Sequence, residues 1–272
     1  MFETKLPNGR RVFCPNPMEV SIIYEQTKSY FHHGFKVDEG DTVFDVGANI
    51  GLFSLTVCDW GLRPVRLFAF EPIPTTFEAL RANVERYQLR GLVPVRCAVS
   101  RGSGMGMFTY YPLATAMSSA YPCDADSADL LEHAFPEILQ HLPSFLRWIE
   151  CLPSRPQAAV IKLLLKIILH GRRVSCQTIS LSDALREHDV DRVDFLKIDV
   201  EKAELEVLQG LEAQYWPKIQ KIVVEVHDID GRLNGVVDML LAHGFQDVIC
   251  EQEPEMKAFE VFTVFARRNV AS

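Results

Sequence analysis

The stretch Thr42-Val43-Phe44-Asp45-Val46-Gly47-Ala48-Asn49-Ile50-Gly51 decides how this chain folds. It begins as a short apolar run, and two glycines follow where a strand would turn into a helix. Glycine allows the sharp turn and leaves no Cβ between the loop and a bound molecule. A second apolar run, 65–70, ends at Glu71-Pro72. The pattern predicts a strand, a glycine loop and a helix, followed by a strand that ends in a carboxylate.

This arrangement is typical of a pocket for a nucleoside. A carboxylate at the end of a parallel strand can accept hydrogen bonds from both ribose hydroxyls, and we expect that role for Glu71. The two glycines do not make the three-glycine dinucleotide pattern, and no Lys-Ser or Lys-Thr pair follows to hold a triphosphate. A nucleoside without a phosphate chain fits better, which favours S-adenosylmethionine.

Further segments carry a family resemblance over about residues 37–267. The chain resembles the FkbM-type S-adenosylmethionine-dependent methyltransferases in five ordered segments: Asp45 to Gly51, Phe70-Glu71-Pro72, Cys97-Ala98-Val99-Ser100, Asp194 to Glu201 and Val224-Glu225-Val226-His227. The resemblance implies an α/β fold of the Rossmann-like class I methyltransferase type, with a seven-stranded, mostly parallel sheet whose last strand is antiparallel. Segments 108–112, 117–119 and 227–233 further resemble the O-methyltransferase domains of modular polyketide synthases.

Ligands of open α/β sheets bind beyond the carboxyl ends of the strands, so residues at those ends are the candidates for the site. For the cofactor we expect contacts from the glycine loop, the ribose carboxylate and the neighbouring strand ends: Asp45, Gly47, Asn49, Gly51, Glu71, Pro72, Ala98 and Asp199. The resemblance places Asp199 beside the methionine end of the cofactor. The chain departs from the family pattern at Lys202, where a glycine is usual.

Two polar residues, Glu225 and His227, alternate with apolar ones at the end of a predicted strand. Methyl transfer to an alcohol requires removal of the hydroxyl proton, and imidazole titrates near neutrality. We therefore expect His227 to act as general base without a metal ion, with its ring oriented by Glu201 or Glu225. The alternative is a magnesium site, since oxygen-rich clusters suit that ion, formed by Asp199, Glu201, Glu225, His227 and Asp228.

The alternation of apolar runs and helical stretches predicts the organisation of the chain. Its 272 residues, of which 48% are hydrophobic, suffice for one large α/β domain. We expect an N-terminal lid segment at 1–36, with a helix from Asn16-Pro17 to about Gly34, and the cofactor-binding half of the core at 37–111. A helical cap is expected at 112–173, with helices at 128–142, 144–151 and 158–170, and the C-terminal half of the core at 174–272.

The composition of the chain limits which kinds of molecule it is expected to bind. The net charge of −8 disfavours a nucleic-acid substrate. The seven scattered cysteines include no C-x-x-C pair, which favours a reduced, cytoplasmic protein, and no apolar run is long enough to span a membrane. Residues 147–173 form a basic island, in which Glu150 is the one acidic residue and the basic residues are Arg147, Arg155, Lys162, Lys166, Arg172 and Arg173. Such an island predicts either an acidic partner or an ordinary solvated face.

These observations predict an S-adenosylmethionine-dependent O-methyltransferase. We expect its substrate to be a hydroxyl or enol of a polyketide-type intermediate, either free or tethered to an acyl carrier protein. One alternative is a stand-alone O-methyltransferase for sugars, glycolipids or other small metabolites. Another is an inactive methyltransferase-fold binding module, which would need neither Glu71 nor His227. The chain has no Asn-Pro-Pro-Tyr loop, and this favours oxygen over nitrogen as the methyl acceptor.

Overall fold

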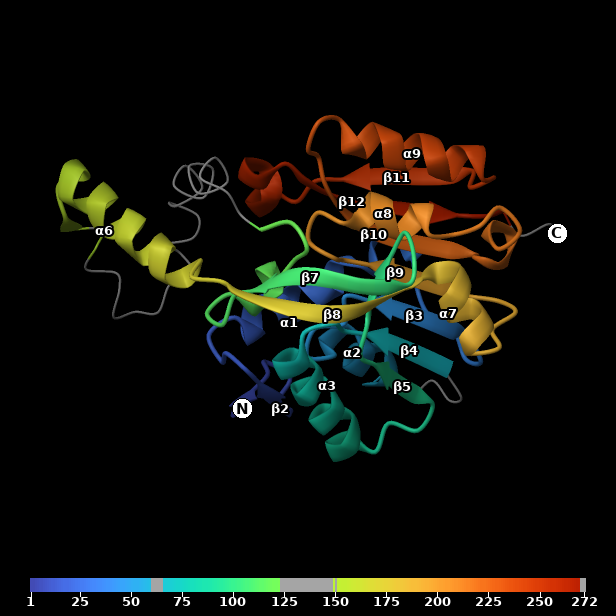
Figure 1. The fold of residues 1–272 in the computed structure, drawn as a ribbon, viewed down its shortest axis with the longest axis horizontal. Coiled ribbons are helices and arrows are strands. Elements are labelled where there is room, and N and C mark those ends of the chain that lie inside the picture. The colour runs from blue at the N-terminus through green and yellow to red at the C-terminus, as the bar shows by residue number, and fades with distance from the viewer. Residues whose placement is uncertain (60–65, 123–148, 150, 270–272) are drawn as a thin grey trace.

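The computed structural model describes residues 1–59, 66–122, 149 and 151–269. Its centre is a seven-stranded sheet in the order β11-β12-β10-β9-β3-β4-β5, from near the top to near the bottom of Figure 1. The strands are β3 (Thr42–Val46), β4 (Arg66–Phe70), β5 (Leu92–Val95), β9 (Phe195–Ile198), β10 (Lys221–His227), β11 (Asp247–Glu251) and β12 (Val261–Arg267). The last strand runs antiparallel to both of its neighbours, and the pairs from β10 to β5 are parallel. The predicted α/β fold with its antiparallel last strand is confirmed.

Both faces of this sheet are covered, which explains why its strands read as nearly continuous apolar runs. On one face Val43 and Phe195 pack with residues of the first two crossover helices, among them Leu80. On the other face Phe44 and Leu196 pack with the later helices. The helices are α1 (Val20–Ser29), α2 (Leu52–Asp59), α3 (Pro74–Tyr87), α7 (Leu181–Glu187), α8 (Glu204–Gln209) and α9 (Arg232–Ala242).

The structure also contains a second, three-stranded sheet. It has the order β6-β8-β7 and consists of β6 (Ala98–Ser100), β7 (Gly104–Tyr110) and β8 (Arg172–Ser180). A tight turn, in which the Cys97 N–H donates to the Val95 carbonyl (3.1 Å), separates β5 in the central sheet from β6 in the second sheet. Strand β8 was not predicted, because its exposed residues give no continuous apolar run.

The N-terminal segment also differs from the expectation. It begins with a hairpin of β1 (Phe2–Lys5) and β2 (Arg11–Cys14), which the sequence did not indicate. The expected helix is shorter, because Asn16 Oδ1 accepts from the Met18 N–H (3.1 Å) and stabilises a turn before α1 begins at Val20. After α1, residues 32–34 form a short 3-10 turn in which His33 has a φ of 54°.

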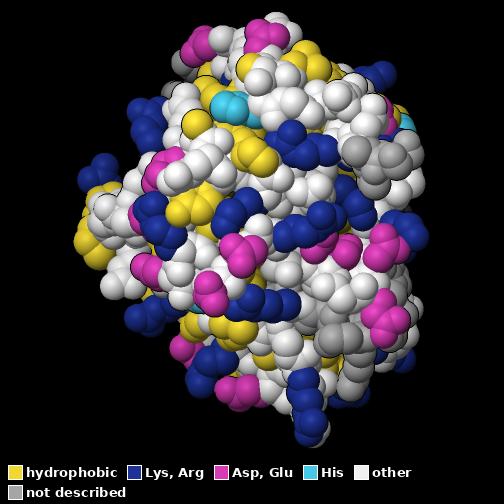
Figure 2. All heavy atoms as spheres, turned by 90° about the vertical axis from the view of Figure 1, so that its right-hand side faces the viewer, with side chains coloured by type: hydrophobic (Ala, Val, Ile, Leu, Met, Phe, Trp, Pro, Cys, Tyr) yellow, Lys and Arg dark blue, Asp and Glu magenta, His cyan; other side chains and the backbone are white. Residues whose placement is uncertain are grey.

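The expected helix at 158–170 is α6 (Ser154–Ile168), which lies at the far left of Figure 1, away from the central sheet. Its buried Ile161 and Leu165 pack with Ile149 and against Met117 and Phe259. The helix expected at 128–142 and most of the one at 144–151 lie outside the described residues. Among the residues that the structure describes, no helix combines the length and the apolar character needed to cross a bilayer. On the face shown in Figure 2, acidic and basic side chains are intermixed.

Candidate active site

A pocket opens at the carboxyl ends of β3, β4 and β9, where an open α/β sheet binds its ligand. Its empty volume, open mouth included, is about 1090 Å³. Of the residues predicted for the site, the pocket wall contains Gly47, Asn49, Glu71, Pro72, Ala98, Asp199 and Glu201. Asp45, Gly51, Glu225 and His227 do not line this pocket, and Glu225 lines a second, smaller one. The structure therefore brings all the predicted residues to one end of the sheet, but not all of them to one pocket wall.

The two glycines of the loop are required by packing against the protein itself. Gly47 has a φ of 78°, and a Cβ at this position would lie 1.7 Å from the Asp199 carbonyl oxygen. Gly51 has a φ of 88°, and its Cβ would lie 2.6 Å from Leu80 Cδ1. Any side chain at Gly47 would therefore push the loop away from the end of β9.

Glu71 joins the glycine loop to the segment that follows β4. Its Oε2 accepts from the Asn49 N–H (3.0 Å) and its Oε1 from the Ile73 N–H (2.8 Å). Burial raises the pKa of this carboxyl to about 7, although the two backbone donors act in the opposite direction. Asn49 has a left-handed φ of 50°, a conformation that asparagine tolerates better than most residues.

Lys197 lies at the centre of the site, and sequence reasoning missed this role. It is 3% exposed, donates to the Gly47 carbonyl (2.8 Å), and its Nζ lies 3.2 Å from Asp45 Oδ1 and 3.5 Å from Asp199 Oδ2. Burial lowers the pKa of Lys197, but Asp45 and Asp199 outweigh it and the net pKa is raised. Asp45 also accepts from Ser54 Oγ (2.7 Å), so it braces the loop from below. The available signal was a lysine inside the apolar strand β9, which demands a buried partner.

Helix α1 and the residue directly after it supply two further groups that the sequence did not single out. The Tyr30 hydroxyl donates to Asp199 Oδ2 (3.0 Å) and lies 3.4 Å from Glu225 Oε2. Gln26 Nε2 donates to the same Glu225 oxygen (2.8 Å). Burial, together with the negative charges of Asp199 and Glu201, raises the pKa of Glu225 to about 8.

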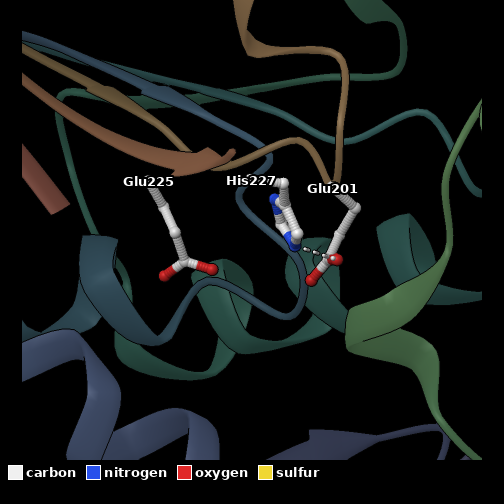
Figure 3. A group of neighbouring side chains, drawn as sticks. All are labelled: Glu201, Glu225 and His227. Atoms are coloured by element: carbon white, nitrogen blue, oxygen red, sulfur yellow. Dashed lines mark ion pairs between the residues drawn. The ribbon is translucent and has the colours of Figure 1, made fainter. Parts of the chain in front are cut away.

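His227 lies between the carboxylates of Glu201 and Glu204, and Figure 3 shows its contact with Glu201. Its Nε2 is 3.3 Å from Glu201 Oε2, and its Nδ1 is 3.0 Å from Glu204 Oε1. Burial lowers the pKa of His227, but the two carboxylates outweigh burial and raise the pKa to about 11. At neutral pH the ring is therefore an imidazolium, which can accept a hydroxyl proton only after giving one up. Glu204, which is fully buried, was not predicted.

Part of the alternative magnesium cluster is also brought together. Glu201, Glu225 and His227 each offer one ligand atom, and these atoms lie within 4.8 Å of one another. Of the other two candidates, Asp228 accepts from the Leu233 N–H (3.0 Å) at the start of α9, and Asp199 is held by Lys197 and Tyr30. A metal ion bound through His227 would have to displace a ring proton that Glu201 and Glu204 stabilise.

The loop that carries Glu201 has an unusual backbone. Glu201 and Lys202 have φ values of 54° and 79°, so two consecutive residues are left-handed. Three side chains hold this shape: Ser119 Oγ donates to the Glu201 carbonyl, Arg232 donates to the Lys202 carbonyl, and Glu204 accepts from the Lys202 N–H (2.7 Å). A left-handed position is where glycine is favoured, which explains the family's usual glycine at position 202.

Sheet order and pocket place this protein among the Rossmann-like class I methyltransferase folds. A solved structure of a methyltransferase FkbM from Methylobacillus flagellatus aligns with 91% of this chain and 52% of its own, with a TM-score of 0.52 at 12% identity. The model of the methyltransferase FkbM domain matches residues 45–246. The chain belongs to the FkbM methyltransferase family, and it is a methyltransferase.

Two relatives differ in how much of their own length aligns with this chain. The 31-O-demethyl-FK506 methyltransferase FkbM of Streptomyces tacrolimicus is 38% identical over 97% of this chain and 96% of its own length. The AMB antimetabolite synthetase AmbE of Pseudomonas aeruginosa is 30% identical over 98% of this chain, which spans 12% of that synthetase.

Proposed function

We propose that this protein transfers a methyl group from S-adenosylmethionine to a hydroxyl of a polyketide-type metabolite. The observation that carries the proposal is one pocket with two unlike walls. One wall contains the glycine loop and the buried carboxylate of Glu71, and the other contains Glu201 in contact with His227. The first suits a nucleoside, and the second suits an alcohol that must lose a proton.

For the cofactor, Glu71 is the proposed acceptor of the ribose hydroxyls, supported by its place in the pocket wall beside Asn49 and Pro72. Asp199, with Tyr30 and Lys197 around it, is the proposed partner of the amino-acid end. Asp45 and Gly51, which we expected to touch the cofactor, are now proposed to support the loop from behind. Ala98 is proposed to contact the adenine base of the cofactor.

The bound cofactor supplies a methyl carbon made electrophilic by its sulfonium. The chain's own part is to orient the hydroxyl and take its proton while the new C–O bond forms. Glu201 faces the pocket, and burial raises its pKa, which makes it a stronger base than an ordinary carboxylate. We propose that His227 and Glu201 act as one base: a proton moving across their 3.3 Å contact determines which of them receives the hydroxyl proton.

The 38% identical relative named as an O-demethyl-FK506 methyltransferase supports oxygen as acceptor and a polyketide-type substrate. The match to a small part of a large synthetase supports delivery of the substrate by another protein, as on an acyl carrier. A free-standing enzyme for sugars or other small metabolites is the alternative, and an inactive binding module is a further one. Arg172 and Arg173 form an exposed basic pair at the start of β8, and this pair supports an acidic partner.

Titration calorimetry with S-adenosylmethionine and S-adenosylhomocysteine tests the cofactor. We expect both to bind, and Glu71→Ala to weaken binding by about 1–3 kcal/mol through loss of a charge-assisted contact. Glu212→Gln, an exposed change on the loop after α8, is the control and should bind normally. No heat from either ligand would refute the assignment.

Turnover of a hydroxylated polyketide substrate tests the proposed role of His227 and Glu201. His227→Ala should lower kcat by roughly 10²–10⁴-fold with cofactor affinity near that of the native protein, because the base acts on the substrate. A chelator should leave activity intact if no metal takes part. Abolition by the chelator with rescue by magnesium would instead establish the metal cluster of Glu201, Glu225 and His227.

A further inference from the structure

One carboxylate in the pocket wall has no role in the reaction described above. Glu206 lies on α8, and its Oε1 accepts from the Tyr121 hydroxyl (2.6 Å). Its Oε2 is shielded from solvent and has no hydrogen-bond partner among the residues that the structure describes. A buried acceptor without a donor costs free energy, so a ligand that brings a donor to this wall would relieve that cost.

The position of Glu206 relates it to one part of a nucleoside. Helix α8 packs closely on β6, since a Cβ at Gly210 would lie 2.3 Å from the Ser100 carbonyl oxygen. Strand β6 follows β5, which pairs with β4, the strand that ends at Glu71. A nucleoside whose ribose is held at Glu71, as the proposed function requires, therefore points its base toward β6 and the facing helix.

The chemistry of this wall determines which base it favours. Ala98 and Val99 have no polar side-chain atoms to offer, so the polar side chains on this part of the pocket wall are those of Ser100, Tyr121 and Glu206. The Tyr121 hydroxyl already uses its proton on Glu206. An ionised carboxylate only accepts hydrogen bonds, so it pairs with an amino group and repels a carbonyl oxygen.

We propose that Glu206 accepts a hydrogen bond from the 6-amino group of the cofactor's adenine and selects this base over a 6-oxopurine. The last torsion of a glutamate side chain is broad, so rotation of the carboxylate presents to the pocket an oxygen that the Tyr121 hydroxyl does not occupy. The inference rests on the proposed cofactor but concerns a different residue and a different part of that molecule.

The test compares S-adenosylhomocysteine with S-inosylhomocysteine, in which an oxygen replaces the 6-amino group, by titration calorimetry. The native protein should bind the amino compound at least about 10-fold more tightly, because the oxo compound leaves Glu206 unpaired and faces it with an acceptor. In Glu206→Gln the ratio should fall to about one or below, because the new amide can donate to the 6-oxo group. Glu212→Gln, at an exposed glutamate three residues after α8, should keep the native ratio.

The comparison of ligands in the native protein does not depend on the folding of any variant. Equal affinity of the native protein for the two compounds would overturn the proposal, and so would a native ratio in a folded Glu206→Gln protein. Binding of neither compound would overturn the proposed cofactor itself, together with this inference. Preference for the amino compound that is lost only in Glu206→Gln supports both.

Discussion

The most unusual residue in the site is Lys202, because a lysine occupies a left-handed position directly after Glu201, which is left-handed too. For a residue with a Cβ this conformation costs about 1–2 kcal/mol. The loop keeps its shape because Ser119, Glu204 and Arg232 each hydrogen-bond to its backbone.

We predict that Lys202→Gly is more stable than Lys202→Ala by about 1 kcal/mol, because only glycine avoids the clash of its Cβ. Both variants lack the lysine charge, so their difference isolates the backbone. Urea unfolding of the two proteins measures it. Equal stabilities would show that the left-handed backbone at this position carries no strain.

Glu225 gives a prediction about pH, because burial raises its pKa to about 8 in the folded protein from an ordinary value of 4.5. Between these values the folded chain binds more protons than the unfolded chain. The free energy of unfolding therefore falls as the pH rises from 4.5 to 8.

We predict that Glu225→Gln, which cannot ionise, removes this loss. The Tm of the variant minus that of the native protein should increase by a few degrees between pH 5 and pH 9. Thermal unfolding at both pH values measures the difference, and Glu212→Gln at an exposed position serves as control. A difference that stays constant or decreases with pH would contradict the buried, protonated state of Glu225.

At the scale of elements, the site is assembled from segments distant in the sequence. Helix α1 contributes Gln26, the residue directly after it is Tyr30, and α8 contributes Glu204 and Glu206. The segment that ends at residue 122 contributes Ser119, whose hydroxyl donates to the Glu201 carbonyl. Through this contact the segment before residue 123 positions Glu201, and the same Ser119 Oγ also accepts from the Tyr121 N–H (3.0 Å).

We predict that Ser119→Ala lowers kcat by roughly 10-fold, because the loop is free to displace Glu201, while cofactor affinity changes by less than about 2-fold. Steady-state kinetics together with calorimetry separate the two quantities. Ser103→Ala, which removes a serine hydroxyl bonded to Asp183 on another loop, is the matched control. An equal loss in cofactor affinity would show that Ser119 supports the whole pocket rather than Glu201.

At the scale of the whole molecule, the basic island contrasts with a chain of net charge −8. Its exposed members include Lys162 and Lys166 on α6 and Arg172 and Arg173 at the start of β8. The next residue of that strand, Val174, is paired with Phe108, which lines the pocket. The two arginines therefore lie beside the pocket, whereas α6 extends away from the sheet (Figure 1).

We predict that reversing both Arg172 and Arg173 to Glu raises KM for a carrier-bound substrate and spares the same acyl group offered as a small thioester. Attraction between the island and an acidic carrier would speed encounter, and the effect should weaken as salt shortens the screening length. Arg90→Glu, at an exposed position in the turn before β5, is the control. Equal effects on both substrates would favour the free-standing enzyme for small metabolites.

The resemblance to the family implied the seven-stranded sheet and its antiparallel last strand. The residues themselves were enough to predict the alternation of strands and helices, the glycine loop and the strand-end position of Glu71. These features depend on local patterns: apolar runs buried on both faces, glycines at turns and polar residues where strands end.

Only the tertiary structure decided which polar residues meet. Lys197 lies between Asp45 and Asp199. Glu204 contacts His227 on the side away from Glu201, and Tyr30 reaches the site from the end of α1. These contacts join residues up to 169 positions apart, and no local pattern encodes such a pairing. The protonation of His227 follows from the same contacts, because a pKa is set by the charges and the burial around a group, not by its neighbours in the chain.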